Sequence, residues 1–402
     1  MIKYADRMKY VKGSVIRDVA SEIASRKNPN LIKLSPGLPD EALFPKEALE
    51  NASSKIYSNN VLCREALQYG ITRGDEELLE ILAQRLRKNE NMDITEANIH
   101  ILTGCQQGIA LSAVALLNEG ETVLIEKPSY LDGLNGMAPY KPNIVGVEND
   151  DEGICIKKLE EYLELYPNTK IIYVIPTFQN PTGKAWTLNR RKEFMEFISQ
   201  PKYDGIYVLE DNPYGEIRFK GEFVPSLKSL DKNGKVIYIG SFSKTLSPGL
   251  RVAYMVHDDV TFIERIEEIK EGADLQSNQF AQVQVRELLK DFDFDEHLNR
   301  VKAVYKEKCD VMIQAMSKEF PEGFNYTMPE GGIFLWVTCP EHVNTSELLS
   351  DALDADVSFI PGSSFHADGS GKNTMRLNFS ANSKENIVEG IRRLAGVFKK
   401  IM

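Results

Sequence analysis

A lysine close to two serines and an arginine is the group in this sequence best suited to covalent chemistry. Lys244 follows Ser241 and Ser243, and Arg251 lies beyond a Pro-Gly turn. Burial and a nearby cation favour the neutral amine of a lysine, which can form a Schiff base with a carbonyl carbon. The serines and the forked, charge-assisted hydrogen bonds of the arginine would suit a phosphate. Taken alone, the segment is better interpreted as a loop with a solvated lysine, so partners must be sought elsewhere.

A glycine turn and an aromatic residue follow the first two predicted strands. Gly104, Cys105 and Gln106 come after a strand at residues 99–103 and open a helix. Glycine at a helix N-terminus leaves backbone N–H groups free to bind an anion. Tyr130 follows the second strand and would cover the same crevice. Taken singly, these features are better explained as an ordinary turn and an ordinary buried aromatic residue.

Polar side chains also follow the fourth and fifth predicted strands. Asn180 lies in an Asn-Pro-Thr-Gly turn, and Asp211 ends a strand three residues before Tyr214. An acidic side chain at the end of a buried strand is unfavourable unless it has a partner. A pyridinium N–H would be such a partner, and the ionised carboxylate would keep the ring an electron sink. Asn180 and Tyr214 would reach the oxygen of the same ring, although a turn alone also explains Asn180.

The order of the predicted elements indicates an α/β fold. Helices alternate with short apolar strands, several of them continuous apolar runs typical of a parallel sheet covered by helices. We expect a large domain at residues 46–285 with a mostly parallel seven-stranded sheet, and a smaller α+β domain at 286–402. Residues 1–45 are expected to form an N-terminal arm with a substrate loop that packs on the small domain. The strands of the large sheet are predicted at residues 99–103, 122–126, 144–148, 170–175, 206–210, 236–240 and 252–256.

Length and composition limit the classes of protein to consider. A chain of 402 residues is expected to form two domains, and a net charge of −11 argues against nucleic acids and anionic membranes as partners. No apolar stretch reaches the ~18 residues of a membrane span, and residues 1–12 lack the apolar core of a signal peptide. The 5 cysteines are scattered and form no zinc-binding pattern. We therefore expect a cytoplasmic protein without a metal.

Six segments, taken in this order, resemble the pyridoxal-phosphate-dependent aminotransferases of fold type I, class I/II. Within that family the sequence is most similar to the 2-aminoadipate and kynurenine aminotransferase branch. The resemblance covers nearly the whole chain, and its segments are residues 69–70, 103–107, 180–183, 211–214, 241–244 and 376–380. It implies pyridoxal 5'-phosphate as cofactor and transfer of an amino group from an aromatic, 2-aminoadipate-like or branched L-amino acid to a 2-oxo acid such as 2-oxoglutarate. It also implies a homodimer with shared active sites.

The resemblance further implies a role for each site residue. Lys244 would form the Schiff base, Asp211 would pair with the ring nitrogen, and Tyr130 would stack on the ring. Arg376 would bind the substrate α-carboxylate, and Gly37 would line the site. The ring oxygen and the phosphate would be bound by Asn180, Tyr214, Gly104, the backbone of Cys105 and Gln106, Ser241, Ser243, Arg251 and Tyr69 of a second subunit.

Two positions depart from the family pattern, and other interpretations stay open. Cys105 stands where the family often has serine, and Asn212 where it often has a second acid. Arg17 matches an N-terminal arginine that in this branch lies near the substrate side chain, but a solvated surface arginine is an equal alternative. A β-lyase or decarboxylase would keep the cofactor. An effector-sensing domain of a transcription regulator is less expected, because the arm begins within the first dozen or so residues and leaves no room for a helix-turn-helix.

Overall fold

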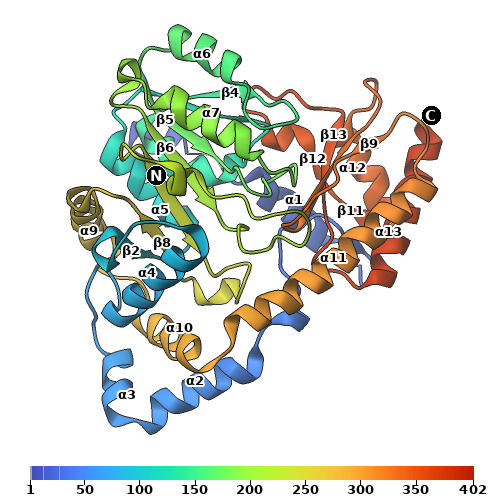
Figure 1. Cartoon of the computed structure of the whole chain (residues 1–402). Helices are drawn as coiled ribbons and strands as arrows, with labels where there is room; N and C mark the ends of the chain where they lie inside the picture. The colour runs from blue at the N-terminus through green and yellow to red at the C-terminus, as the bar shows by residue number, and fades with distance from the viewer. Residues whose placement is uncertain (1, 12, 27) are drawn as a thin grey trace.

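The computed structural model describes residues 2–11, 13–26 and 28–402. Figure 1 shows β9, β12 and β13 together with α11, α12 and α13 at one side of the molecule, and the strands of a larger sheet at the other. The α-helices are α1 (Val15–Ser25), α2 (Lys46–Ser58), α3 (Asn60–Leu67), α4 (Glu76–Glu90), α5 (Cys105–Leu116), α6 (Ile156–Leu165), α7 (Leu188–Ile198), α8 (Leu227–Leu230), α9 (Val260–Asp274), α10 (Gln279–Asp291), α11 (Phe294–Glu319), α12 (Thr345–Asp354) and α13 (Lys384–Ile401). The strands are β1 (Ile32–Lys33), β2 (Ile99–Leu102), β3 (Thr122–Lys127), β4 (Asn143–Glu148), β5 (Thr169–Val174), β6 (Tyr207–Asn212), β7 (Val236–Ser241), β8 (Ala253–Val256), β9 (Asn325–Tyr326), β10 (Phe334–Thr338), β11 (Val357–Ser358), β12 (Ile360–Pro361) and β13 (Thr374–Asn378).

The large sheet has seven strands in the order β2-β8-β7-β6-β5-β3-β4. β4, β3, β5, β6 and β7 pair in parallel, and β8 is antiparallel to both β7 and β2. The prediction of a mostly parallel seven-stranded α/β sheet is therefore confirmed. Because β2 runs in the same direction as β7, the segments that follow β2, β3, β5, β6 and β7 all emerge at one edge of the sheet.

Helices cover both faces of this sheet, which explains why its strands are continuous apolar runs. Tyr173 and Leu209 pack on one face in a core shared with α5 and α9, while Ile172 and Val208 pack on the other with α6 and α7. α4 and α10 enclose the end of the sheet formed by β2 and β8. The sheet is consequently covered on both faces, and the acidic side chains Glu126, Glu210 and Asp211 lie toward the carboxyl ends of their strands.

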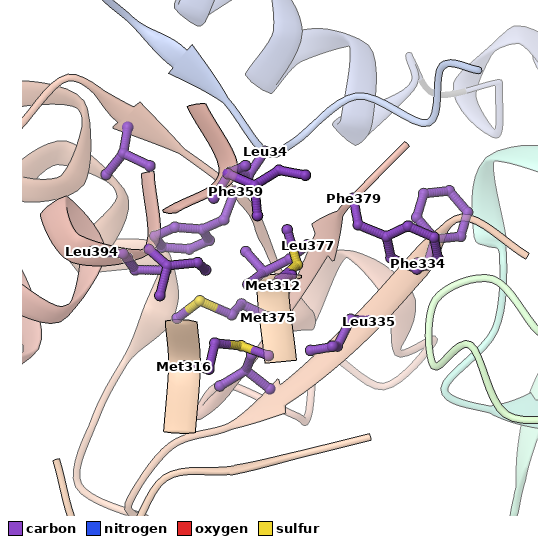
Figure 2. Close-up of a cluster of buried hydrophobic side chains, with 14 of the residues drawn as sticks. Leu34, Met312, Met316, Phe334, Leu335, Phe359, Met375, Leu377, Phe379 and Leu394 are labelled. Atoms are coloured by element: carbon purple, nitrogen blue, oxygen red, sulfur yellow. The ribbon is translucent and has the colours of Figure 1, made fainter. Parts of the chain in front are cut away.

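A second core lies between the small sheets and the C-terminal helices. β12-β13-β10-β9 form an antiparallel sheet, and β1 pairs in parallel with β11. Figure 2 shows Leu34 beside Phe359, with Met312 and Met316 of α11 and Leu394 of α13 in the same cluster. The N-terminal segment thus contributes to the core that also holds β13 in place.

Among the described residues, five helices lie where no element was predicted, namely α3, α8, α9, α10 and α12. Ser14 caps α1, accepting a hydrogen bond from the backbone N–H of Arg17 (3.0 Å). α10 continues past residue 285, and the domain boundaries at residues 45 and 285 stay predictions. In the part of the chain that the structure describes, no helix has the length and apolar composition of a membrane span.

Candidate active site

A cavity of about 280 Å³ lies at the edge of the large sheet where the parallel strands end. Segments from the large sheet, the N-terminal loop and β13 meet around it. Most of the predicted site residues line it: Gly37, Cys105, Gln106, Tyr130, Asn180, Asp211, Tyr214, Ser241, Ser243, Lys244, Arg251 and Arg376. Ile16, Ile109, Ile175, Pro213, Pro248 and Phe334 complete the lining. The fold therefore brings together residues that lie far apart in the sequence.

Lys244 is the nucleophile candidate at the centre of this cavity. It follows the end of β7, and its Nζ donates a hydrogen bond to the carbonyl oxygen of Gly37 (2.7 Å). Burial, and then the charge of Arg376, lower the pKa of Lys244 to about 8. Arg251 also lowers the pKa of Lys244, but by less than Arg376 does. The more distant residue in sequence is therefore the more important cation. The ammonium form still predominates at pH 7, but the neutral amine is far more accessible than in a lysine with the ordinary pKa.

Asp211 offers a buried carboxylate oxygen without a partner. Its Oδ2 accepts a hydrogen bond from the hydroxyl of Tyr173 (2.9 Å), whereas Oδ1 is buried and has no hydrogen bond among the described residues. Burial raises the pKa of Asp211 to about 6, although hydrogen bonds from Tyr173 and Cys105 oppose the rise. A buried carboxylate oxygen is unfavourable without a donor, so it fits a cationic N–H in the cavity.

An anion-binding corner lies between the N-terminus of α5 and the turn after β7. Gly104 precedes α5 with φ of +82°, and a Cβ at this position would collide with the guanidinium of Arg251. Arg251 donates to the carbonyl oxygen of Thr103 (3.2 Å). Ser241 donates to the hydroxyl of Ser243 (2.8 Å). Free N–H groups of a helix N-terminus, two hydroxyls and an arginine form a suitable cradle for a phosphate.

Arg376 is a fully buried guanidinium in the middle of β13. Its Nη1 donates to Asn180 Oδ1 (2.8 Å) and its Nη2 to the carbonyl oxygen of Ser35 (2.8 Å), while Nε is buried without a partner among the described residues. The guanidinium lies 4.2 Å from the ring centroid of Phe334 and 5.1 Å from that of Phe365. Burial lowers the pKa of Arg376 to about 10, which leaves it charged at neutral pH. Such a buried cation in the wall of a cavity fits a carboxylate.

Two tyrosines enclose the same space. Tyr130 stands after β3, where the backbone of Gly133 lies so close to its ring that a Cβ there would be 2.8 Å from it. Burial raises the pKa of Tyr130 to about 12. Tyr214 is buried, and its ring meets that of Phe334 edge to face at 5.8 Å. Both phenols are therefore neutral hydrogen-bond donors.

Three predicted residues are not part of the cavity lining: Gly104, which directly precedes the lining residue Cys105, Tyr69 and Arg17. Tyr69 is 75% exposed and is not part of the lining. Arg17 is also exposed, and it is Ile16 that reaches the cavity. Tyr173, which donates to Asp211, was not predicted as a site residue. The only sequence feature that could have indicated it is a hydroxyl in an otherwise apolar stretch of β5. Asn212, the departure from the family pattern, donates to the hydroxyl of Tyr238 (3.1 Å).

Fold and site together define a pyridoxal-phosphate-dependent enzyme. The unpaired Asp211 oxygen suits a protonated ring nitrogen, the corner beside Gly104 suits a phosphate, and the amine of Lys244 suits an aldehyde. In the part of the chain that the structure describes, no group of three or more His, Cys, Asp or Glu residues could hold a metal ion.

Comparison with known proteins places the chain in one family. The family model "Aminotransferase class I and II" matches residues 29–394. The aromatic-amino-acid aminotransferase 1 of Thermococcus litoralis is 36% identical over 403 residues, covering 99% of this chain and 94% of that protein. The crystal structure of Pyrococcus horikoshii kynurenine aminotransferase in complex with PMP has a TM-score of 0.92 at 35% identity, covering 99% of this chain and 97% of the other.

The α-aminoadipate aminotransferase of Thermus thermophilus, complexed with N-(5'-phosphopyridoxyl)-L-leucine, has a TM-score of 0.89 at 35% identity and the same coverage. The chain belongs to the class I and II aminotransferases. It is a pyridoxal-phosphate-dependent enzyme that transfers an amino group, so the family, fold, cofactor and reaction expected from the sequence are confirmed. These relatives do not favour the lyase, decarboxylase or effector-sensing alternatives.

Proposed function

We propose that Lys244, Asp211 and Tyr130 are the catalytic residues of an aminotransferase that accepts aromatic, 2-aminoadipate-like or branched L-amino acids. The acceptor is a 2-oxo acid such as 2-oxoglutarate. One observation carries the proposal: the buried amine of Lys244 shares a cavity with the unpaired oxygen of Asp211 and the guanidinium of Arg376. The names of the relatives, which refer to aromatic amino acids, kynurenine and α-aminoadipate, support this range of donors.

Asp211, Asn180, Tyr214 and Tyr130 hold the cofactor ring. Bound pyridoxal phosphate supplies an aldehyde carbon that exchanges amines and a protonated ring that withdraws electrons from the substrate α-carbon. Asp211 would hold the ring nitrogen, since its Oδ1 is buried without a donor among the described residues. Because the Asn180 carbonyl oxygen already accepts from Arg376, its amide nitrogen is left to donate to the ring oxygen beside the Tyr214 hydroxyl. Tyr130 stacks on the ring.

The phosphate is held by the corner at the start of α5. Backbone N–H groups there are unpaired by the helix itself, and hydroxyls and a guanidinium converge on the same space. The residues that hold it are Gly104, Cys105, Gln106, Ser241, Ser243 and Arg251. The serine-to-cysteine departure at position 105 is tolerated, because the thiol lies beside Asp211 and the backbone N–H is unaffected.

Lys244 and Arg376 act on the substrate. Arg376 binds the α-carboxylate next to Gly37, which fixes the α-carbon within reach of Lys244 Nζ and supplies part of the rate by positioning. With the cofactor bound, the neutral amine of Lys244 would be the base for the substrate α-proton, and its lowered pKa makes that unprotonated form accessible near neutral pH. Arg17 is the candidate group for a distal substrate carboxylate.

The active unit is a homodimer in which the partner subunit's Tyr69 completes the phosphate site. Tyr69 is 75% exposed beside other exposed apolar side chains, Tyr57, Val61, Leu67 and Ile71. α3, which carries part of this surface, lies at the periphery of the molecule in Figure 1. A surface of this kind marks an interface. A dimer in solution, and weaker cofactor binding by Tyr69→Ala, are the expected results.

Two further assignments complete the proposal. Residues 46–285 form the large cofactor-binding domain and residues 286–402 the small domain, with the arm of residues 1–45 packed on the latter. The protein works in the cytoplasm, which the 5 free cysteines support.

A visible-absorbance screen against a panel of amino acids tests the function. Addition of one amino acid without a 2-oxo acid is expected to convert the cofactor once, to its amine form, and then to stop. Continued turnover under these conditions would instead identify a lyase or decarboxylase. Absence of conversion with every aromatic, acidic and branched amino acid would contradict the proposed substrate class.

A further inference from the structure

The loop that carries Asn180 connects the end of β5 to the start of α7. Across its base, the backbone N–H of Trp186 donates to the carbonyl oxygen of Pro176 (2.7 Å). Asn180 lies near the far end, only 5% exposed, where its carbonyl oxygen accepts from Arg376. Next to Asn180, Gln179 Nε2 donates to the carbonyl oxygen of Pro128 (2.9 Å). The position of the Asn180 amide therefore depends on this local contact and on the residues that hold the base of the loop.

Arg191 of α7 holds both ends of the base. Its Nη2 donates to the carbonyl oxygen of Pro176 (2.8 Å) and to Thr177 Oγ1 (2.9 Å), and its Nε donates to the carbonyl oxygen of Trp186 (3.3 Å). A fourth hydrogen bond goes from Nη1 to the carbonyl oxygen of Pro225 (3.0 Å). Arg191 is 0% exposed, and all these acceptors are neutral. Burying a charge without a direct ion pair is unfavourable, so packing alone does not explain an arginine here.

Glu126 of β3 also contacts both ends of this loop, with its two carboxylate oxygens. Its Oε2 accepts from the backbone N–H of Ile175 (2.7 Å), and its Oε1 accepts from the indole Nε1–H of Trp186 (2.8 Å). Asn149 also donates to Oε1 (3.3 Å). Glu126 is 1% exposed, and burial raises its pKa to about 7 against the effect of these hydrogen bonds. Both carboxylate oxygens are thus occupied by donors at the two ends of the same loop.

We propose that Arg191 and Glu126 are positioning residues of the aminotransferase reaction, which hold residues 175–187 so that the Asn180 amide faces the cofactor's ring oxygen while its carbonyl supports Arg376. The proposal rests on the role of Asn180 proposed above. Neither side chain lines the cavity. Both act through the loop, and they connect α7 and β3 to the two groups that orient ring and substrate.

Glu126→Gln is the sharpest perturbation, because it is nearly isosteric. A glutamine offers one oxygen and one NH₂ group, so either the Ile175 N–H or the Trp186 indole N–H loses its acceptor. A buried donor left unpaired is expected to weaken pyridoxal phosphate binding to the apoprotein on the order of tenfold. We also expect a shift in the pH midpoint of the bound cofactor's visible absorption, since the donor to the ring oxygen is displaced.

Trp186→Phe in the Glu126→Gln background provides the rescue. The phenyl ring has no N–H, so the glutamine oxygen is free to accept from Ile175, and most of the lost affinity and the original midpoint are expected to return. Arg191→Lys is expected to lose affinity as Glu126→Gln does, because one ammonium cannot reach both ends of the loop. Its matched control is Arg190→Gln on the same helix, since Arg190 binds Asp150, Glu193 and the carbonyl of Ile154 rather than the loop.

The outcomes separate this proposal from the proposed function. Wild-type cofactor affinity and midpoint in Glu126→Gln and Arg191→Lys, with only a lower melting temperature, would show that these residues are merely structural and overturn the proposal. Equal losses in Arg190→Gln would overturn it as well. Asn180→Ala serves as the separate check: an unchanged absorption in that variant would remove the proposed role of Asn180, and the positioning proposal with it.

Discussion

Replacing Tyr173 by phenylalanine tests how the site keeps Asp211 ionised. The Tyr173 hydroxyl donates a hydrogen bond of 2.9 Å to Oδ2 of this buried carboxylate, and the pKa of Asp211 is already raised to about 6. A hydrogen bond to a charged group contributes roughly 1.5–3 kcal/mol, which corresponds to a change of roughly 1 to 2 in pKa. In Tyr173→Phe, Asp211 is therefore expected to stay protonated up to a pH that is higher by that amount.

Cofactor affinity depends on pH because Asp211 must be ionised to bind the ring nitrogen. Only the carboxylate accepts from a protonated ring nitrogen, so cofactor affinity falls as the pH drops through the pKa of Asp211. Wild-type apoprotein is expected to lose affinity below about pH 6, and Tyr173→Phe at a pH higher by roughly 1 to 2. The free cofactor titrates identically in both experiments, so the difference between the two curves belongs to the protein.

The stability of the apoprotein changes with pH in the opposite sense to the cofactor affinity. A carboxyl whose pKa is higher in the folded state than in the unfolded chain binds its proton longer when folded. Stability of the apoprotein therefore falls as the pH rises from about 4, the ordinary value, to about 6. In Tyr173→Phe this window extends upward, which denaturant titrations of apoprotein at several pH values measure.

Affinity curves for pyridoxal phosphate across roughly pH 5 to 9, a range that spans the pKa of Asp211 in both proteins, provide the main assay. Tyr238→Phe is the matched control, because it removes a buried hydroxyl from the neighbouring strand β7 that binds Asn212 and not Asp211. Superimposable curves for wild type and Tyr173→Phe would refute the reasoning. A shift of equal size in Tyr238→Phe would refute it too.

Three further predictions concern residues of the cavity and its rim. Lys244→Ala is expected to abolish the visible absorbance of the covalently bound cofactor and transamination while the circular dichroism spectrum stays unchanged; retained activity would contradict the role of Lys244. Arg376→Lys is expected to raise KM for amino acids by on the order of 100-fold through loss of the forked contact, which steady-state kinetics check. Arg17→Ala is expected to weaken the binding of dicarboxylic substrates more than that of aromatic ones. Equal losses in kcat/KM for both would contradict the proposed contact of Arg17 with a distal substrate carboxylate.

The large sheet could be predicted because its strands carry their own signal. Residues 170–175 and 236–240 are apolar runs of the length of a strand, and chemically distinctive residues follow them directly. In a parallel sheet, residues that follow strands meet at one edge, so Asn180 and Lys244 were placed at the same cavity without any knowledge of pair distances.

The supporting contacts could not be predicted, because they depend on register and on packing between distant segments. Tyr173 meets Asp211 only because β5 and β6 pair with Tyr173 opposite Leu209. α10 buries polar residues beside its apolar ones: Gln282, Arg286 and Glu287 are buried in it, and Arg286 pairs with Asp75, the residue that caps α4. Periodicity arguments assume that buried means apolar, and they fail where charges pair inside the protein.

Arg376 also shows why the chemistry of Lys244 depends on the whole fold. Its charge is the second largest cause, after burial, of the lowered pKa of Lys244. A substrate carboxylate bound to Arg376 neutralises that charge, so the repulsion felt by Lys244 weakens and its pKa rises. Under the proposed roles, the neutral amine would be more accessible before substrate binds, and the same amine would be a stronger base once the substrate carboxylate is in place. Because Arg376 comes from β13 and Lys244 from the end of β7, this change occurs only when the small sheet and the large sheet hold both groups in one cavity.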